Sequence, residues 1–259
     1  MSELIQLEKR DHIAILTIAN PPANTWTADS LAALEATIED LNADRNIFAL
    51  VVTGQGEKFF SAGADLKTFA DGDRARANEM AQKFGQAFAT LTAFRGVSIA
   101  AINGYAMGGG LECALSCDIR IAESHAQMAL PEAGVGLLPC AGGTQNLPWL
   151  VGEGWAKRMI LCGERVDASK ALQIGLVEEV VPSGQGLEAA LKLAEGACKQ
   201  SPSSIARCKQ LVMSARDGRS HTDGWRMERE LFVELFHTED QKEGVNAFLE
   251  KRKPEWKNR

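Results

Sequence analysis

The sequence reads AINGYAMGGGLECAL from Ala101 to Leu115, a short apolar run followed by three consecutive glycines and an apolar helical segment. Glycine lets the backbone approach a ligand closely, at a cost in conformational entropy. Three glycines where a strand passes into a helix therefore predict free N–H groups that face a bound group. The positive end of a helix also suits an oxygen that gains negative charge. A tight turn that needs a positive φ is the structural alternative.

Glu112 lies in the first turn of this predicted helix, on an otherwise apolar segment. A nucleotide-phosphate loop is disfavoured, because neither Gly-Lys-Ser/Thr nor Gly-x-Gly-x-x-Gly occurs here. A buried ionised carboxylate costs several kcal/mol unless it is paired or its pKa shifts. We therefore predict that Glu112 is catalytic, and a partner that merely compensates its charge is the alternative.

Two further segments are ambiguous when taken alone. Glu132 follows Pro131 in MALPEAGVG, where a strand-like run gives way to a glycine-rich loop, and a glutamate in such a loop is often simply solvated. The turn FFSAGADLK, residues 59–67, contains Gly63 and Asp65, which are ordinary turn residues. A plain loop explains this turn as well as a binding role does.

Around these segments, apolar runs typical of strands alternate with helical periodicity, which predicts an α/β fold. Strands are expected at Ile13–Ile18, Phe48–Thr53, Ser98–Asn103 and Asp118–Ala122. Apolar residues at helical spacing follow the first and second of these strands: Leu31, Leu34, Ile38 and Leu41, then Met80, Phe84, Phe88 and Leu91.

The last third of the chain changes character. A helix at Ala168–Ile174 closed by Gly175 and a strand at Leu176–Val181 precede a purely helical tail, in which Ser201-Pro202 marks one boundary and Thr238-Glu239-Asp240-Gln241 offers a capping box. We expect a core over residues 1–186 and a helical segment over 187–259. Its apolar residues should pack on the core or on a second subunit, because exposure would favour aggregation: Leu231, Phe232, Leu235, Phe236 and Phe248.

Composition excludes several classes of protein. The net charge is −6, so no overall basic field attracts nucleic acid or an anionic membrane. No apolar run reaches the roughly 18–20 residues that cross a bilayer, and the N-terminus lacks the pattern of a signal peptide, so a cytoplasmic protein is expected. The six cysteines and four histidines show no metal-ligand spacing, which predicts reduced thiols and no metal.

Together the segments resemble the crotonase, or enoyl-CoA hydratase/isomerase, superfamily over essentially the whole chain. The resemblance rests on AGADLK at 62–67, NGYAMGGGLE at 103–112, Pro131-Glu132 with Gly136, GGTQ at 142–145 and FLEKRK at 248–253. It implies an α/β spiral of repeated strand–strand–helix units, and a C-terminal helical segment that forms trimers or hexamers built as dimers of trimers.

The resemblance also implies a site. Glu112 and Glu132 match the two catalytic glutamates of the hydratases, and the N–H groups of Ala64 and Gly109 match an oxyanion hole that binds the thioester carbonyl. The coenzyme A of the substrate would contact residues 62–67 (Ala62, Gly63, Ala64, Asp65, Leu66 and Lys67), with Phe248 and Lys251 reaching it from the last helix. No permanent cofactor is implied. Lys251 lies in a Lys-Arg-Lys run, for which a solvated charge cluster is the alternative.

The implied reaction is addition of water to a 2-enoyl-CoA, as in fatty-acid β-oxidation or related acyl-CoA catabolism. A Δ3,Δ2-enoyl-CoA isomerase needs only one carboxylate, so two glutamates favour hydration. RNA binding is disfavoured, because residues 71–94 carry few cations among acids. The chain departs from the hydratases at two positions. At Cys140 the family has a glycine whose N–H contacts the catalytic water, and the resemblance implies that the N–H of Cys140 can still make this contact. At Asn146 arginine is usual.

Overall fold

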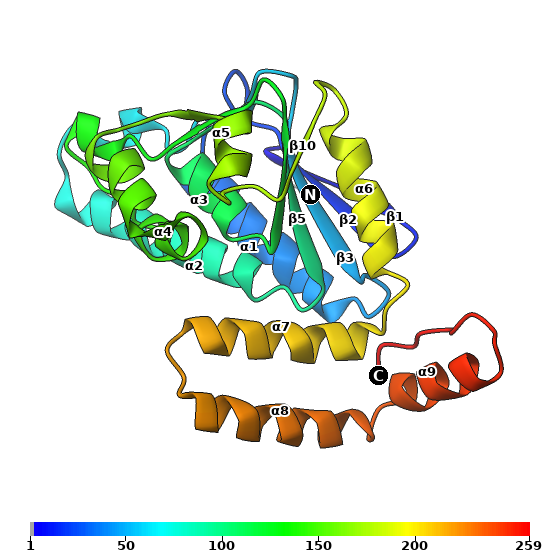
Figure 1. Ribbon diagram of the computed structural model, residues 1–259. Helices are drawn as coiled ribbons and strands as arrows, with labels where there is room; N and C mark the ends of the chain where they lie inside the picture. The colour runs from blue at the N-terminus through cyan, green and yellow to red at the C-terminus, as the bar shows by residue number, and fades with distance from the viewer. Residues whose placement is uncertain (1–2) are drawn as a thin grey trace.

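The computed structural model describes residues 3–259 and shows a mixed α/β fold built around two sheets (Figure 1). The larger sheet has six strands in the order β1-β2-β3-β5-β7-β10, and only β1 and β2 pair antiparallel. Its strands are β1 Ile5–Arg10, β2 Ile13–Ile18, β3 Ala49–Gly54, β5 Val97–Ile102, β7 Ile119–Glu123 and β10 Glu179–Val181.

The smaller sheet has four short strands in the order β4-β6-β8-β9, of which β4, β6 and β8 run parallel. They are β4 Phe59–Ser61, β6 Tyr105–Met107, β8 Gln127–Ala129 and β9 Val166–Asp167. Two 3₁₀ helices accompany them, η1 Leu66–Phe69 and η2 Glu132–Val135. Because parallel strands point the same way, the segments that follow β4, β6 and β8 emerge at one edge of this sheet.

Nine α-helices are described in residues 3–259. They are α1 Ala28–Ala43, α2 Arg74–Thr92, α3 Gly109–Leu115, α4 Gly143–Leu161, α5 Ala168–Gln173, α6 Gly186–Ala197, α7 Pro202–Arg216, α8 His221–Leu235 and α9 Glu239–Leu249. Helix α4 bends at Gly152, whose φ of 76° and ψ of 160° are not helical. The first six helices flank the sheets, and α7 to α9 lie below them (Figure 1).

The chain repeats one pattern three times. The pairs β3-β4, β5-β6 and β7-β8 each place one strand in the larger sheet and the next in the smaller sheet, and each pair is followed by a helix: α2, α3 and α4. This repeat confirms the strand–strand–helix architecture that the sequence predicted by resemblance.

The central strands are buried on both faces, as their continuous apolar runs require. In β3, Leu50 and Val52 join the main core, while Ala49 and Val51 join a second cluster to which α6 contributes Ala190 and Ala194. Helix α6 thus packs on the sheet, so the segment that departs from the core begins at α7. The sequence-based division into 1–186 and 187–259 stays a proposal.

The predicted strands and helices of the core are present, with one correction. The chain from Leu176 to Glu178 is not strand, and β10 covers only Glu179–Val181. The amide of Leu176 donates to the carbonyl oxygen of Ala171, which turns the backbone back onto α5 before the sheet is reached. Gly175, with a φ of 79°, makes that turn, as expected of a glycine that ends a helix.

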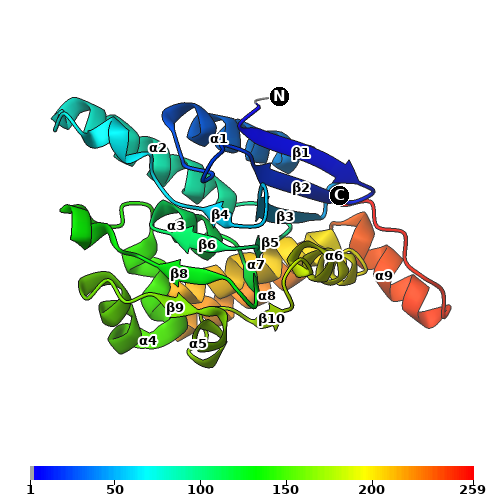
Figure 2. The ribbon, with the colours of Figure 1, turned by 90° about the horizontal axis from the view of Figure 1, so that it is seen from above.

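The C-terminal helices are attached to the core by polar contacts. Helices α7 and α8 form an antiparallel pair, and α9 extends to one end of the molecule (Figures 1 and 2). The Lys209 ammonium of α7 donates to Asp118 Oδ2 at 2.8 Å and to the carbonyl oxygen of Phe94 at 2.6 Å. After α9, Asn258 Nδ2 donates to the carbonyl oxygen of Arg45 at 2.8 Å, and Arg45 Nη1 donates to the carbonyl oxygen of Asn258 at 3.1 Å.

The apolar residues of this segment divide into two groups. Leu231 is 8 % exposed, whereas Phe232, Phe236 and Phe248 are 62 %, 58 % and 82 % exposed. The three phenylalanines therefore do not pack on the core of their own chain. Thr238 accepts from the amide of Gln241, which is one half of the predicted capping box. The other half is not formed, because the Thr238 amide donates to the carbonyl oxygen of Leu235. No helix in residues 3–259 is both long and apolar enough to cross a membrane.

Candidate active site

The segments that follow β4, β6 and β8 border one pocket of about 860 Å³. The first contributes Ala62–Ala64, the second Met107–Gly109 with Glu112, and the third Pro131–Glu132. Each turn of the repeat therefore supplies one wall of the same pocket.

Glycines allow the first two segments to touch. Gly63 has a φ of 89°, and a Cβ there would lie 2.6 Å from the carbonyl oxygen of Met107 and 3.1 Å from the amide nitrogen of Gly109. A Cβ on Gly110 would lie 2.1 Å from the carbonyl oxygen of Ser61. Side chains at these positions would force the two segments apart.

Two amides at this junction have no acceptor. Trp26 pairs with Ala64 in a parallel bridge, in which Gly63 O accepts from Trp26 and Asp65 N–H donates to Trp26. The N–H of Ala64 itself points away from Trp26 in such a bridge. Gly109 is the first residue of α3, where an amide has no partner within the helix. Neither amide donates a hydrogen bond within residues 3–259, and both residues line the pocket.

Glu112 is buried, at 2 % exposure, and one of its oxygens is fixed. Oε1 accepts from the amides of Ala141 at 2.8 Å and Gly143 at 2.9 Å. Its other oxygen makes no hydrogen bond in the described part of the chain. Burial raises the pKa of Glu112, and the two amide hydrogen bonds oppose that rise.

Glu132 begins η2 and has no such support. Both carboxylate oxygens are buried and lack a hydrogen-bond partner among residues 3–259. Burial, opposed by the nearby amide of Glu132 itself and assisted by the negative charge of Glu112, raises the pKa of Glu132 to about 7. The influence of Glu112 reflects how close the two carboxylates are. The sequence alone left this residue undecided.

Cys140 lies beside both glutamates and lines the pocket. Burial, together with the charges of Glu112 and Glu132, raises the pKa of its thiol to about 11, so the thiol stays protonated at neutral pH. Asn146, the second departure from the hydratase pattern, borders a different cavity, between α3, α4 and α7.

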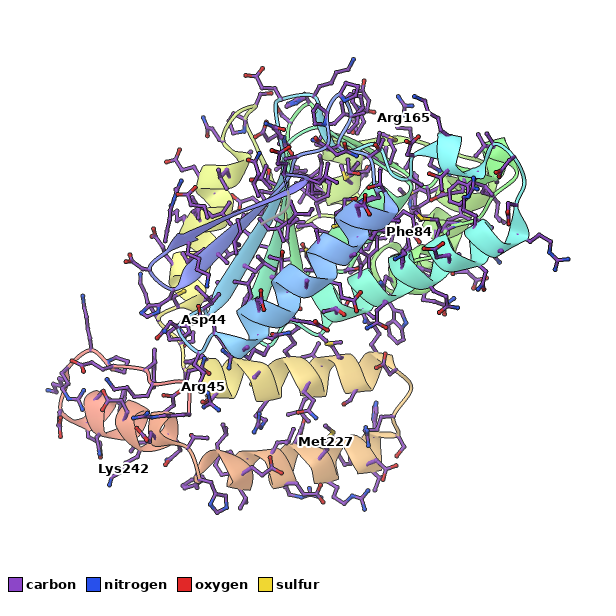
Figure 3. The ribbon with its side chains drawn as sticks, turned by 180° about the vertical axis from the view of Figure 1, so that it is seen from behind. Asp44, Arg45, Phe84, Arg165, Met227 and Lys242 are labelled. Carbon is purple, nitrogen blue, oxygen red and sulfur yellow. The ribbon has the colours of Figure 1, made fainter. Side chains whose placement is uncertain are left out.

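The residues expected to bind coenzyme A are only partly brought together. Ala62, Gly63, Ala64 and Leu66 line the pocket. Asp65 instead caps η1, accepting from the amide of Lys67 at 3.1 Å. Phe248 lies on α9 and Lys251 just after it, and neither lines the pocket. Helix α9 and helix α2, which borders the pocket, lie on opposite sides of the molecule (Figure 2). Figure 3 shows the same separation between Phe84 of α2 and Lys242 of α9.

Several lining residues were missed by the sequence analysis. They are the apolar groups of α2 and of residues 135–138. The amides of Ala141 and Gly143, which hold Glu112 from outside the pocket lining, were also missed. The helical spacing of α2 identified its core face but gave no sign of its pocket face. No group of three or more His, Cys, Asp or Glu side chains in the described chain could hold a metal ion.

Known proteins share this architecture. Residues 8–259 match the family described as Enoyl-CoA hydratase/isomerase. The chain is 40 % identical to the 2,3-dehydroadipyl-CoA hydratase of Escherichia coli, with all of both chains covered. It is 38 % identical to the short-chain-enoyl-CoA hydratase of Clostridium acetobutylicum, over 98 % of this chain and 97 % of that one.

Among solved structures, DspI of Pseudomonas aeruginosa is similar to this chain with a TM-score of 0.96 and 66 % identity, over 99 % of this chain and 97 % of that one. The sequence and the fold of this chain match those of these proteins over nearly its full length. The chain belongs to the enoyl-CoA hydratase/isomerase family, the crotonase superfamily, whose members act on CoA thioesters.

Proposed function

We propose that this protein is an enoyl-CoA hydratase, which adds water across the C2–C3 double bond of a 2-enoyl-CoA to give a 3-hydroxyacyl-CoA. One observation carries the proposal. Two buried glutamates with raised pKa values share a pocket with two unpaired backbone amides. Addition of water to a conjugated thioester needs a base, an acid and donors for the carbonyl oxygen, and this set matches that need.

The unpaired amides of Ala64 and Gly109 would bind the thioester carbonyl oxygen. Their hydrogen bonds draw electron density toward that oxygen, so C3 becomes electrophilic. As C3 is attacked, negative charge grows on the same oxygen and the hydrogen bonds strengthen. In other enzymes one such donor contributes roughly 3–4 kcal/mol to the transition state.

The two carboxylates divide the proton transfers. Glu112 is held by Ala141 and Gly143, which favour its ionised form, so it is suited to orient and deprotonate the attacking water. Glu132 lacks hydrogen-bond donors and its pKa is raised to about 7, so about half of it is protonated at neutral pH, and this form can deliver the proton to C2. The hydroxyl group ends on C3 and the proton from Glu132 on C2. The proton that Glu112 took from water then passes to Glu132, which restores both carboxyl groups.

The experiment follows the loss of ultraviolet absorbance as crotonyl-CoA loses its conjugated double bond. The wild-type protein should remove this absorbance, and Glu112→Gln and Glu132→Gln should each slow it by about 10²–10⁴-fold. Glu188→Gln, on the exposed face of α6, is the matched control and should leave the rate unchanged. Equal rates in all four proteins would disprove the assignment.

A Δ3,Δ2-enoyl-CoA isomerase is the competing activity within the family. It moves one proton between carbons and needs one carboxylate, whereas both glutamates face this pocket. Reaction in isotope-labelled water separates the two activities, because a hydratase places solvent oxygen on C3 and an isomerase does not. The proposed place of the reaction is fatty-acid β-oxidation or related acyl-CoA catabolism.

We also propose that the protein is a homo-oligomer, a trimer or a hexamer. The support is the exposure of Phe232, Phe236 and Phe248 on α8 and α9. Since α9 lies far from the pocket of its own chain, Phe248 and Lys251 would contact coenzyme A only from a neighbouring copy. Light scattering of the purified protein tests the assembly. A monomer would contradict it.

A further inference from the structure

The pocket extends beyond the glutamates along two apolar walls. Helix α2 contributes Ala77, Ala81 and Phe84, which are four and three residues apart and therefore share one helical face. The second wall is the segment that follows Glu132, and it contributes Val135, Leu137 and Leu138.

These walls offer no partner to a charged or strongly polar group. Besides Glu112 and Glu132, the only polar side chains that line the pocket in the described chain are Thr25 and Cys140, and no Lys, Arg, His, Asn or Gln does so. A carboxylate or ammonium on the far end of an acyl group would lose its hydration here without gaining a hydrogen bond or an opposite charge. The negative glutamate also disfavours a second negative group.

The same walls suit an alkyl chain. Val135 and Leu138 are 57 % and 67 % exposed, so apolar surface at the mouth of the pocket faces water until something covers it. That surface is continuous with the glutamate pair. A group attached to the carbons that react can therefore reach it, and a chain of methylene groups would remove it from water.

The exposure of the side chains along α2 shows which end of this wall lies near the glutamates and which end lies near solvent. Phe84 is buried and lies against the site, since a Cβ on Gly109 would be 2.9 Å from its Cε1. Ala81 is half-buried, and Ala77 is exposed. Four residues of helix span about 6 Å, so an acyl chain that leaves Glu132 along α2 passes Ala81 several carbons before it passes Ala77.

We propose that this wall of α2, with residues 135–138, is the acyl channel of the enzyme. The channel selects unfunctionalised alkyl chains longer than crotonyl over chains with a charged end. Ala81 and Ala77 set the accepted chain length. The inference rests on the proposed function, because it concerns the acyl group of the same CoA thioester. Small side chains at both positions leave the channel open to its mouth.

The first test compares two six-carbon substrates that differ only at the far end, 2-hexenoyl-CoA and 2,3-dehydroadipyl-CoA. The channel predicts a kcat/KM at least about a hundredfold higher for 2-hexenoyl-CoA, because an unpaired buried polar group discriminates strongly. Equal values, or a preference for the acid, would overturn the charge selection.

The second test narrows the channel at each depth. Ala81→Phe should lower the ratio of kcat/KM for 2-octenoyl-CoA to that for crotonyl-CoA by about tenfold or more, in line with the roughly 10–200-fold effect of small changes in pocket volume. Ala77→Leu should lower the ratio of kcat/KM for 2-dodecenoyl-CoA to that for 2-octenoyl-CoA by about tenfold. Ala75→Phe, on the opposite face of the same helix, is the matched control and should change none of these.

Two readouts separate failure of this inference from failure of the proposed function. Hydration of crotonyl-CoA by the wild-type protein reports the function alone. Binding of saturated butyryl-CoA and octanoyl-CoA, measured by calorimetry, reports the channel even if no hydration occurs. If Ala81→Phe and Ala75→Phe bind octanoyl-CoA equally well, α2 is not the wall of the channel. The Ala77→Leu variant, at an exposed position, keeps the test valid if Ala81→Phe does not fold.

Discussion

Glu112 and Glu132 face the same pocket, but their carboxylates have opposite hydrogen-bonding environments. Glu112 sits on a helix, with one oxygen fixed by two amides from α4 and the segment before it. Glu132 sits on a single 3₁₀ turn, with both oxygens buried and no donor among residues 3–259. The contrast gives two carboxylates of one site different surroundings, because two amides from other segments stabilise the ionised form of Glu112 and none does so for Glu132 in the described chain.

The largest effect expected from this contrast is on the pH dependence of stability. The pKa of Glu132 rises from 4.5 to about 7 on folding, so between these values the folded protein holds a proton that the unfolded chain has lost. Stability therefore falls as pH rises through this window and levels off above it. The full cost at pH 8 is about 2–3 kcal/mol, allowing for partial solvent access.

Glu132→Gln removes this cost. Its free energy of unfolding should exceed that of the wild-type protein by about 2–3 kcal/mol at pH 8 and should approach it at pH 4. Denaturant unfolding at the two pH values measures the difference. A constant difference would mean that Glu132 is not protonated in the folded protein.

The next effect is on the difference in free energy of unfolding between the Gln and Ala variants, which should differ in sign between positions 112 and 132. At position 112, Gln keeps an acceptor for the amides of Ala141 and Gly143, and Ala leaves both without one. Glu112→Ala should therefore be less stable than Glu112→Gln by about 1–3 kcal/mol. At position 132 no donor is waiting, so Glu132→Ala should be at least as stable as Glu132→Gln. The same order at both positions would mean that the two environments do not differ.

A smaller effect is expected from the glycine that supports Glu112. A Cβ on Gly143 would lie 2.9 Å from Glu112 Oε1, so Gly143→Ala should displace the carboxylate and lower kcat by about tenfold. Gly154→Ala, on the same helix with open space around it, is the control and should keep full activity. An unaffected Gly143→Ala protein would show that the position of this oxygen is not critical.

The smallest effect is expected at Cys140. Its thiol is protonated and has no assigned chemical step, so Cys140→Gly should change crotonyl-CoA hydration by no more than roughly twofold, the range of a substitution that removes no buried contact. A loss of more than tenfold would give the thiol a direct role. Steady-state kinetics with crotonyl-CoA decides between these outcomes.

The parts that the sequence predicted are those with local signals. The long strands have uninterrupted apolar runs, and Glu112 is a charge within an apolar helix, so both were visible without a structure. The three-residue strands of the smaller sheet are too short to show any periodicity. Their positions depend on pairing with segments more than twenty residues away.

Glu132 and the amides that donate to Glu112 show more clearly what could not be predicted from the sequence alone. A glutamate after a proline in a glycine-rich loop is usually solvated, and its burial here comes from packing against distant segments. The amides of Ala141 and Gly143 reach Glu112 across about thirty residues of chain, through the approach of α4 to α3. The family resemblance assigned the glutamates, but only the three-dimensional arrangement shows what holds each one.

The threefold repeat has a consequence for how this chemistry can change. Each of the three successive windings places residues in the pocket: Ala64 after β4, Gly109 and Glu112 after β6, and Glu132 after β8. A substitution after β8 can therefore replace the proposed proton donor without disturbing the amides after β4 and β6. One scaffold can thus keep binding a thioester while substitutions in a single winding change the reaction at the carbon chain.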